Sequence, residues 1–437
     1  MGSTHASVHG RHASLTVLAL LLTFSVSAFA AESRLSLADA QRLAVERSRQ
    51  LIGNDAATAA AREMAIAAAQ LPDPVATLGI NNLPVNGPDA GSLTRDFMTM
   101  RSVGVMQEWT RAEKRQARSE RYLRDAEKSV ADKTAGIAAI RRDAAIAWLN
   151  RYYAEAMLAA LAEQKDQAEL ELEAAESAYR TGRGPSAEIL ASRGALIGLQ
   201  DRASELGFRV TAAKFALARW LGEEANAALA AAPALDRIAL DARTFESDLE
   251  QHPEVAVLAT KEALAAAEVK LAQANAKADW TVSLMYSQRG PMYSNMISVN
   301  VSVPLQWNAS ARQDRETASK LAMLDQARAE REDMVRAHVA EVRAMIAEWQ
   351  NDRERVMRYE QELLPAAAQR TEAVIGAYRG SKASLADVLL ARRNEIDLRL
   401  QALQLQSNAA RLWAQLEFLL PHDDVDHSGG HVSAVAP

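Results

Sequence analysis

The sequence of 437 residues contains no cysteine. Disulfide bonds, thiolate metal sites, cysteine nucleophiles and a lipid anchor on an N-terminal cysteine are therefore excluded. Aromatic residues make up only 5% of the chain, so a thick globular core is not expected. The formal net charge of −6 is small and gives no basic surface for nucleic acid. Alanine and charged residues are abundant instead, which is typical of long helices packed as coiled coils.

The first thirty residues have the pattern of a secretory signal peptide. Arg11 and His12 precede an apolar run from Leu15 to Phe24, and residues 28–30 (Ala-Phe-Ala) form a small-residue cleavage site. The run is about 10 residues long, which is too short to span a bilayer as a helix. We therefore expect residues 1–30 to be removed and the mature chain to be exported.

The longest feature of the chain is a helical pattern that occurs twice. A proline-free run rich in strong helix formers predicts a long helix over residues 108–179, which at 1.5 Å per residue would be roughly 105 Å long. A second such helix is predicted over residues 309–378. Similar short sequence segments surround Trp109 and Trp307, which are 198 positions apart. The same is true of Tyr179 and Tyr378, which are 199 positions apart. The chain is therefore an internal duplication.

Four short segments alternate between apolar and polar residues, as transmembrane β-strands do. They are residues 75–83, 99–107, 280–288 and 295–305. Periodicity alone equally fits ordinary hairpins packed on helices. Two hairpins of this size, however, cannot form a core of their own, and four strands cannot close a barrel, which needs about eight. Three copies of the chain would supply twelve.

Three tryptophans stand where predicted strands meet predicted helices, at Trp109, Trp280 and Trp307. Tryptophan concentrates at the interface between membrane and water, so these three are expected at one level, in an aromatic belt. The alternative is that each packs between helices.

A tight turn and a returning helix follow each long helix. The first turn contains Gly182 and Gly184, and the second contains Gly380 and Ser381. Glycine permits the left-handed backbone that such turns use. The returning helices are predicted over 186–221 and 384–420. The two repeats then cover 31–221 and 253–420, with a linker at 222–252 and a disordered acidic tail at 421–437.

No enzymatic motif is present: the sequence has no Walker motif, no GxSxG and no HExxH. We therefore expect no enzyme and no cofactor. His252 and His338 are isolated in the sequence. Weak candidates for metal binding are the tail histidines, for which a solvated tail is the alternative: His422, His427 and His431. Methionines gather in the strand regions, where thioether sulfur suits soft metals but also lipid contact and packing.

The order of these elements resembles the TolC-like outer-membrane efflux proteins, over residues 36–420. The resemblance implies a mainly α-helical homotrimer, in which a twelve-stranded transmembrane β-barrel stands on a periplasmic α-helical barrel. It further implies a passive exit duct in the outer membrane of a Gram-negative cell, surrounded by outer-membrane lipid. The expected partners are a periplasmic adaptor (membrane fusion) protein and an inner-membrane pump of the RND type.

The same resemblance implies roles for residues at the turns. Tyr378 and Glu188 match the pair whose contact narrows the closed tip of relatives, with Tyr179 the repeat counterpart of Tyr378. Asp387 matches an acidic ring that lines the aperture. The turn residues Gly182, Gly184, Gly380 and Ser381 would form the tip where the adaptor docks. An acid in the first turn of a helix also stabilises the helix end, which is the alternative for Glu188 and Asp387.

The chain departs from the family pattern at three positions of the second turn. Leu390 stands where relatives carry a second acidic ring, Ala383 stands where a constricting arginine is expected, and Ser381 stands at the glycine position.

A further likeness concerns the substrate. The phrase Asp96-Phe-Met-Thr99, with Lys114 and Arg115 downstream, resembles the heavy-metal branch of the family, the cobalt–zinc–cadmium and copper–silver resistance subunits. The rival interpretations are a duct for drugs or secreted proteins, and a periplasmic structural coiled coil without a pore.

Overall fold

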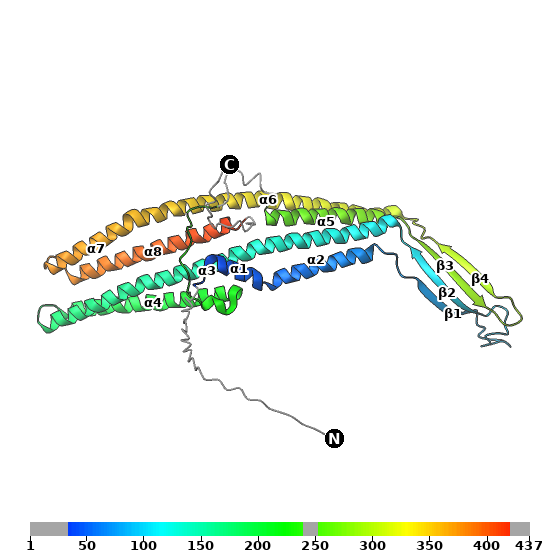
Figure 1. Cartoon of the computed structure of the whole chain (residues 1–437), viewed down its shortest axis with the longest axis horizontal. Coiled ribbons are helices and arrows are strands. Elements are labelled where there is room, and N and C mark those ends of the chain that lie inside the picture. The colour runs from blue at the N-terminus through cyan, green and yellow to red at the C-terminus, as the bar shows by residue number, and fades with distance from the viewer. Residues whose placement is uncertain (1–33, 239–251, 420–437) are drawn as a thin grey trace, which may run out of the picture.

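The computed structural model of the chain describes residues 34–238 and 252–419. It is a long rod with helices along most of its length and a small sheet at one end (Figure 1). The predicted signal peptide 1–30, residues 239–251 of the linker 222–252 and the tail with its three histidines lie outside the described residues.

The first repeat contains two short helices, two strands and a pair of long helices. In chain order these are α1 (Leu37–Arg47), α2 (Arg49–Ala68), β1 (Val75–Asn81), β2 (Met100–Trp109), α3 (Ala112–Arg180), α4 (Ser186–Leu221) and η1 (Gly222–Asn226). The long helix begins at Ala112 and not at residue 108, because Glu108 and Trp109 still pair with strand β3.

The second repeat follows the same order. Its elements are α5 (Pro253–Asn275), β3 (Trp280–Gln288), β4 (Met296–Ser302), η3 (Ala309–Ala311), α6 (Gln313–Arg358), η4 (Tyr359–Leu363), α7 (Leu364–Arg379) and α8 (Leu385–Glu417). Strand β4 ends at Ser302, short of the predicted residue 305, since Pro304 has no N–H for a strand ladder.

The second long helix is interrupted, and the prediction of one unbroken helix over 309–378 was wrong. A π-helical turn, η4, separates α6 from α7, and the Leu364 N–H bonds back to the Tyr359 carbonyl. A π-turn adds one residue to a helix. This residue explains why the repeat offset is 198 at Trp307 but 199 at Tyr378. The wider turn also stands directly before Pro365, whose ring would clash with a carbonyl of a regular α-helix.

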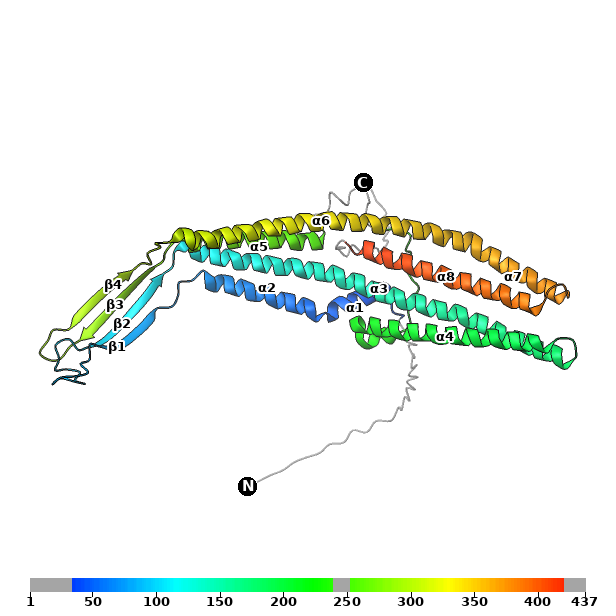
Figure 2. The same cartoon turned by 180° about the vertical axis from the view of Figure 1, so that it is seen from behind.

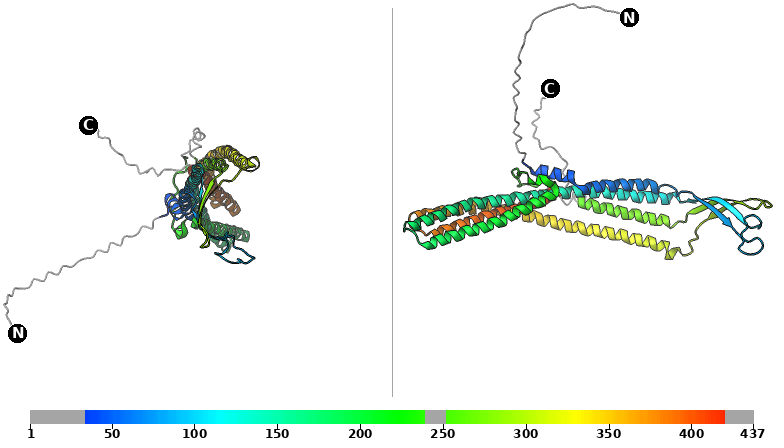
Figure 3. Two further views of the ribbon diagram at one scale, coloured as in Figure 1. Left: turned by 90° about the vertical axis from the view of Figure 1, so that its right-hand side faces the viewer. Right: turned by 90° about the horizontal axis from the view of Figure 1, so that it is seen from below.

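The helices form one layer rather than a bundle. In the half nearer the sheet, α3 packs between α2 and α5, and α5 packs on α6. In the other half, α3 pairs with α4, α7 pairs with α8, and α8 also packs on α3. The view from behind shows the same order of helices (Figure 2), and the rod is seen end-on and from below in Figure 3.

The largest apolar core lies at the middle of the rod, where elements of both repeats meet. Trp148 of α3 is completely buried there, its indole N–H donates to the Leu35 carbonyl at 3.0 Å, and its ring stacks on Tyr152. Arg151, also buried, donates to the Ala225 carbonyl at 2.6 Å. This core ties the short helix α1 and the chain after α4 to the long helix α3.

Candidate functional site

The four strands form one antiparallel sheet in the order β1-β2-β3-β4, drawn from residues about 200 positions apart. Their register places apolar side chains in rows across one face. One row joins Leu78, Val103, Tyr286 and Ile297, and the next joins Ala76, Val105, Leu284 and Val299. Each large side chain in these rows is exposed. An apolar face without cover is unusual for a protein in water and marks contact with a membrane or a partner.

The opposite face of the sheet is polar. A typical row there joins Thr77, Gly104, Met285 and Ser298. Gly104 is required at its place in this row, because a Cβ atom there would lie 2.8 Å from the Leu284 carbonyl oxygen. The sheet therefore has one apolar side and one polar side along its whole width.

Two of the three predicted interface tryptophans pair directly. Trp109 and Trp280 are partners across β2 and β3, both on the apolar face and each about half exposed. Trp307 lies five residues beyond the end of β4 and is 88% exposed. The placement of all three tryptophans at one level stays a prediction.

The two tip turns have the same backbone hydrogen bonds. The Arg183 N–H bonds to the Ala178 carbonyl and the Gly182 N–H to that of Tyr179; in the second turn Lys382 and Ser381 repeat both bonds. Gly182 has φ +69° and Ser381 has φ +57°, so Ser381 occupies the left-handed position. Gly380, at φ −83°, does not need to be glycine.

This comparison predicts opposite effects of substitutions at two equivalent positions. Ser381→Gly should stabilise the second turn, and Gly182→Ala should destabilise the first, each by about 1 kcal/mol, because a Cβ is disfavoured at positive φ. Thermal unfolding of both variants measures the effect, with Gly380→Ala as the control that should change little. Equal effects at Gly380 and Gly182 would contradict the assignment.

The residues predicted to form a gate lie around the second turn. Tyr378 packs in a small apolar cluster with Ile375 and Leu385. Burial, and then the nearby carboxylates of Glu188 and Glu171, raise the pKa of the Tyr378 phenol. Its counterpart Tyr179 is exposed. The Glu188 carboxylate of the first repeat thus lies close enough to Tyr378 of the second to influence its phenol, whereas Tyr179 is exposed to solvent.

Asp387 begins helix α8 as part of a capping box with Ser384. The Ser384 backbone N–H and hydroxyl both donate to the Asp387 carboxylate, at 2.9 and 2.7 Å, and the Asp387 N–H donates to the Ser384 hydroxyl. These bonds lower the pKa of Asp387. The side chain is exposed and lines a cavity of about 360 Å³ with Arg370 and Leu390. It is therefore a helix cap with a charge that remains open to solution.

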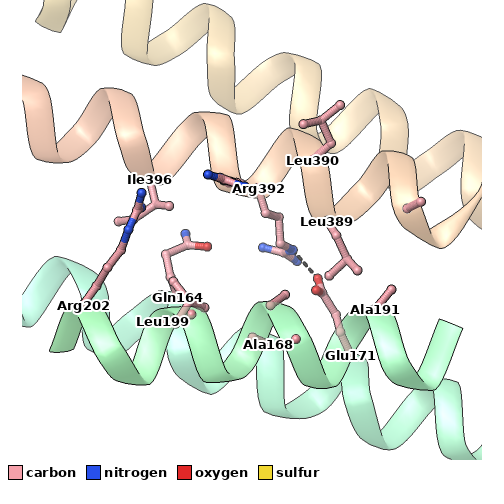
Figure 4. Close-up of a pocket in the computed structure, with 15 residues that line it drawn as sticks. Gln164, Ala168, Glu171, Ala191, Leu199, Arg202, Leu389, Leu390, Arg392 and Ile396 are labelled. Atoms are coloured by element: carbon pink, nitrogen blue, oxygen red, sulfur yellow. Dashed lines mark ion pairs between the residues drawn. The ribbon is translucent and has the colours of Figure 1, made fainter. Parts of the chain in front are cut away.

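A second cavity, of about 500 Å³, lies between α3, α4 and α8 near the tip (Figure 4). Small residues of α4 line one side, among them Ala191, Gly194 and Gly198. The Glu171 carboxylate of α3 and the Arg392 guanidinium of α8 form an ion pair across it. Burial raises the pKa of Glu171, an effect that Arg392 opposes.

Two side-chain contacts in the structure could not be predicted from the sequence. Glu171 and Arg392 stand 221 positions apart, and nothing in the sequence pairs them. His252 and His338 were described as isolated, but the His252 Nδ1 and His338 Nε2 atoms lie 2.9 Å apart where α5 begins beside α6.

Within residues 34–238 and 252–419, three or more His, Asp or Glu side chains nowhere gather closely enough to hold a metal ion. In the same part of the chain, every helix is too short or too polar for a bilayer crossing.

Several solved structures with the same architecture are outer-membrane proteins. The outer-membrane channel CmeC of Campylobacter jejuni is 13% identical with a TM-score of 0.74, over 88% of this chain and 85% of that one. The outer-membrane protein VceC of Vibrio cholerae is 18% identical with a TM-score of 0.71, over 88% and 95%. The open state of the MtrE outer-membrane channel of Neisseria gonorrhoeae is 15% identical with a TM-score of 0.70, over 88% of both chains.

No protein-family model matches the sequence, and no curated protein matches it either. The likeness is therefore one of shape at low identity. The predicted mainly helical fold with a duplicated helix–hairpin–helix order is confirmed, and the chain has the fold of the TolC-like outer-membrane channels.

Proposed function

We propose that the chain is one subunit of a homotrimeric outer-membrane channel, a passive exit duct of a tripartite efflux system. In this assembly a periplasmic adaptor and an inner-membrane pump of the RND type deliver the substrate. The observation that carries the proposal is the sheet with an exposed apolar face, a polar opposite face and two edge strands, β1 and β4, each without a second neighbour among the described residues.

The unpaired backbone N–H and C=O groups of such edge strands find partners when the sheet closes into a barrel. Strand directions alternate from β1 to β4, so β4 of one copy can pair in antiparallel fashion with β1 of the next. Closure abolishes edges, and three copies supply twelve strands, enough for an aqueous lumen. The apolar face would then contact lipid, and the polar face would line the lumen.

Fractionation of cells that express the full chain tests the proposal. We expect a trimer in the outer-membrane fraction that conducts ions in planar bilayers. A soluble periplasmic species without conductance would favour the structural coiled coil instead.

The aperture is proposed to lie at the tip, where Tyr378 and Glu188 narrow it and Asp387 lines it. In a trimer, three Asp387 carboxylates would face a narrow axis and attract cations. We expect Asp387→Ala to lower cation selectivity and the block by multivalent cations in single-channel recordings.

The capping box provides a matched control for this prediction. Ser384→Ala removes the two bonds of the Ser384 hydroxyl but keeps the carboxylate, so it should cost about 1 kcal/mol of stability and leave selectivity unchanged. If Asp387→Ala behaves like Ser384→Ala, the residue is only a helix cap and the aperture assignment is wrong.

For the substrate we propose soft heavy-metal cations. Four methionines lie on the polar face of the sheet, away from the lipid side: Met100, Met106, Met285 and Met296. Thioether sulfur binds soft metals weakly, as a conducting path requires. The motif that resembles the heavy-metal branch has a structural role here, since Asp96 accepts hydrogen bonds from the Met98 and Thr99 N–H groups.

Growth of cells that lack the chain separates the substrate classes. Sensitivity to silver and copper salts supports the metal substrate, whereas sensitivity to lipophilic drugs alone supports a drug duct. Cells with a variant in which all four methionines are replaced by leucine should show the same metal sensitivity. The variant should still assemble as a trimer.

A further inference from the structure

Histidine is scarce in the body of the chain. Six of the eight histidines lie in the predicted signal peptide or in the tail: His5, His9, His12, His422, His427 and His431. The other two, His252 and His338, stand 86 positions apart in the sequence, and the fold brings them into direct contact. Any role for imidazole between the signal peptide and the tail must therefore use this pair.

The two imidazole rings meet edge to face where α5 begins beside α6. Nδ1 of His252 lies 2.9 Å from Nε2 of His338, and the ring planes are 88° apart. His252 is the N-cap residue of α5, directly before Pro253, and is 1% exposed. His338 is half-buried on α6. Because a helix fixes each position, the two nitrogens are held in place before any ligand arrives.

The two facing nitrogens can do one of two things. In neutral imidazoles, one nitrogen donates its N–H and the other accepts, which gives a single hydrogen bond. Alternatively, each ring carries its proton on the outer nitrogen, Nε2 of His252 and Nδ1 of His338, and both facing nitrogens then present lone pairs. The second arrangement is the one that binds a metal ion, and it needs only a change of tautomer in the donor ring.

The separation of the two nitrogens favours one coordination geometry. With nitrogen–metal bonds of about 2.0–2.1 Å, two ligands lie about 2.9 Å apart at a right angle and about 3.3–3.4 Å apart at the tetrahedral angle. The observed 2.9 Å matches the right angle. Square-planar or tetragonal sites of nitrogen and oxygen are typical of Cu²⁺ and Ni²⁺, and Cu²⁺ binds most strongly of the first-row divalent ions. Cu²⁺ is therefore the ion that the pair fits best.

The surroundings of the pair supply space and oxygen ligands. A cavity of about 20 Å³, enough for one water molecule, is lined by both histidines and Glu254. A larger cavity of about 350 Å³ is lined by His338, Glu254 and Glu341, and both carboxylates are exposed, so ions can enter from solution. Arg142 also lines the small cavity, but its guanidinium is engaged by Asp143 at 2.9 Å.

We propose that His252 and His338 bind one Cu²⁺ ion, with water and the nearby carboxylates of Glu254 and Glu341 in the remaining positions. Two imidazoles are fewer than the three-residue clusters that the described part of the chain lacks, so the ion is held less tightly than in a closed structural site. The bound ion clamps the start of α5 to α6 in the middle of the rod (Figure 1). The site goes beyond the proposed function, because it needs neither the ring nor the pore.

Calorimetric titration of the purified full-length chain with Cu²⁺ tests the proposal. The tail histidines can also bind Cu²⁺, so the reference is a full-length variant with His422, His427 and His431 replaced by alanine. We expect this variant to bind one ion per chain. Adding His338→Gln, which keeps a hydrogen-bonding side chain beside His252, should weaken binding at least about tenfold. Unchanged affinity after His338→Gln, or no binding in the reference variant, would overturn the proposal.

Thermal unfolding gives a second measurement. Saturating Cu²⁺ should raise the Tm of the reference variant by about 2–4 °C, because a ligand that binds only the folded state stabilises it. The same Cu²⁺ should leave the Tm of the His338→Gln variant unchanged, and Mg²⁺, which prefers oxygen ligands, should shift neither. Equal shifts with Cu²⁺ in both variants would place the ion elsewhere and refute the assignment. Neither measurement uses conductance, so its failure is distinct from a failure of the proposed channel function.

Discussion

Val299→Arg is expected to destabilise the assembled sheet in a membrane by about 2–4 kcal/mol, the cost of a charge near the middle of a lipid-facing strand. Val299 lies in the central apolar row with Leu284 and Val105, two rows of residues away from the Trp109–Trp280 pair. Yields of folded trimer in reconstituted lipid, measured over a series of urea concentrations, give the free energy.

Two neighbours on the same strand serve as controls for Val299→Arg. Ser298→Arg points to the polar face and should be tolerated. Val301→Arg is on the apolar face but lies in the row next to the tryptophans, so its cost should fall to about 1 kcal/mol or less near the interface. Equal effects at Val299 and Ser298 would contradict the assignment of the lipid face.

Trp148→Ala should be the most damaging single change in the helical part, at about 3–5 kcal/mol. The side chain is completely buried in the central core, stacks on Tyr152 at 5.4 Å and donates to the Leu35 carbonyl. Its removal leaves a cavity in a core where elements of both repeats meet, and it takes one of two donors from the Leu35 carbonyl, which keeps the Ala230 N–H. Unfolding followed by far-UV circular dichroism measures the loss.

Trp148→Phe separates the two contributions. It keeps most of the ring volume but removes the indole N–H, while the Leu35 carbonyl keeps the Ala230 N–H, so the lost hydrogen bond should cost only about 1 kcal/mol beyond the partial cavity. If Phe and Ala are equally damaging, the hydrogen bond and not the packing dominates at this position.

Much of the fold could be predicted because its signals are local. Alternation in residues 297–303 marks a strand with two different faces, and the Ser384–Asp387 spacing marks a helix start that the structure shows as a full capping box. The repeat gave the element order in both halves. The π-turn was not predicted, although the offset between equivalent residues of the two repeats rises from 198 to 199 and so indicates one extra residue in the second long helix.

The candidate site was predictable only in part. The turn positions follow from glycine and helix-start signals, but the partners of their side chains do not. Glu171 meets Arg392 because α8 packs on α3, and His252 meets His338 because α5 starts beside α6. A charged residue on a long helix has the same local sequence signature whether it faces water or a partner.

By itself, the sequence determined the helices, the strands, the two faces of each strand and the duplication, since each depends on spacing along the chain. Only the tertiary structure decided which helices of the two repeats touch. It put α8 against α3 and buried Ile396 of α8, but left Ile197, which is 199 positions earlier on α4, exposed. The physical reason is that periodicity fixes which face of a helix is apolar, whereas the partner of that face depends on the packing of distant segments.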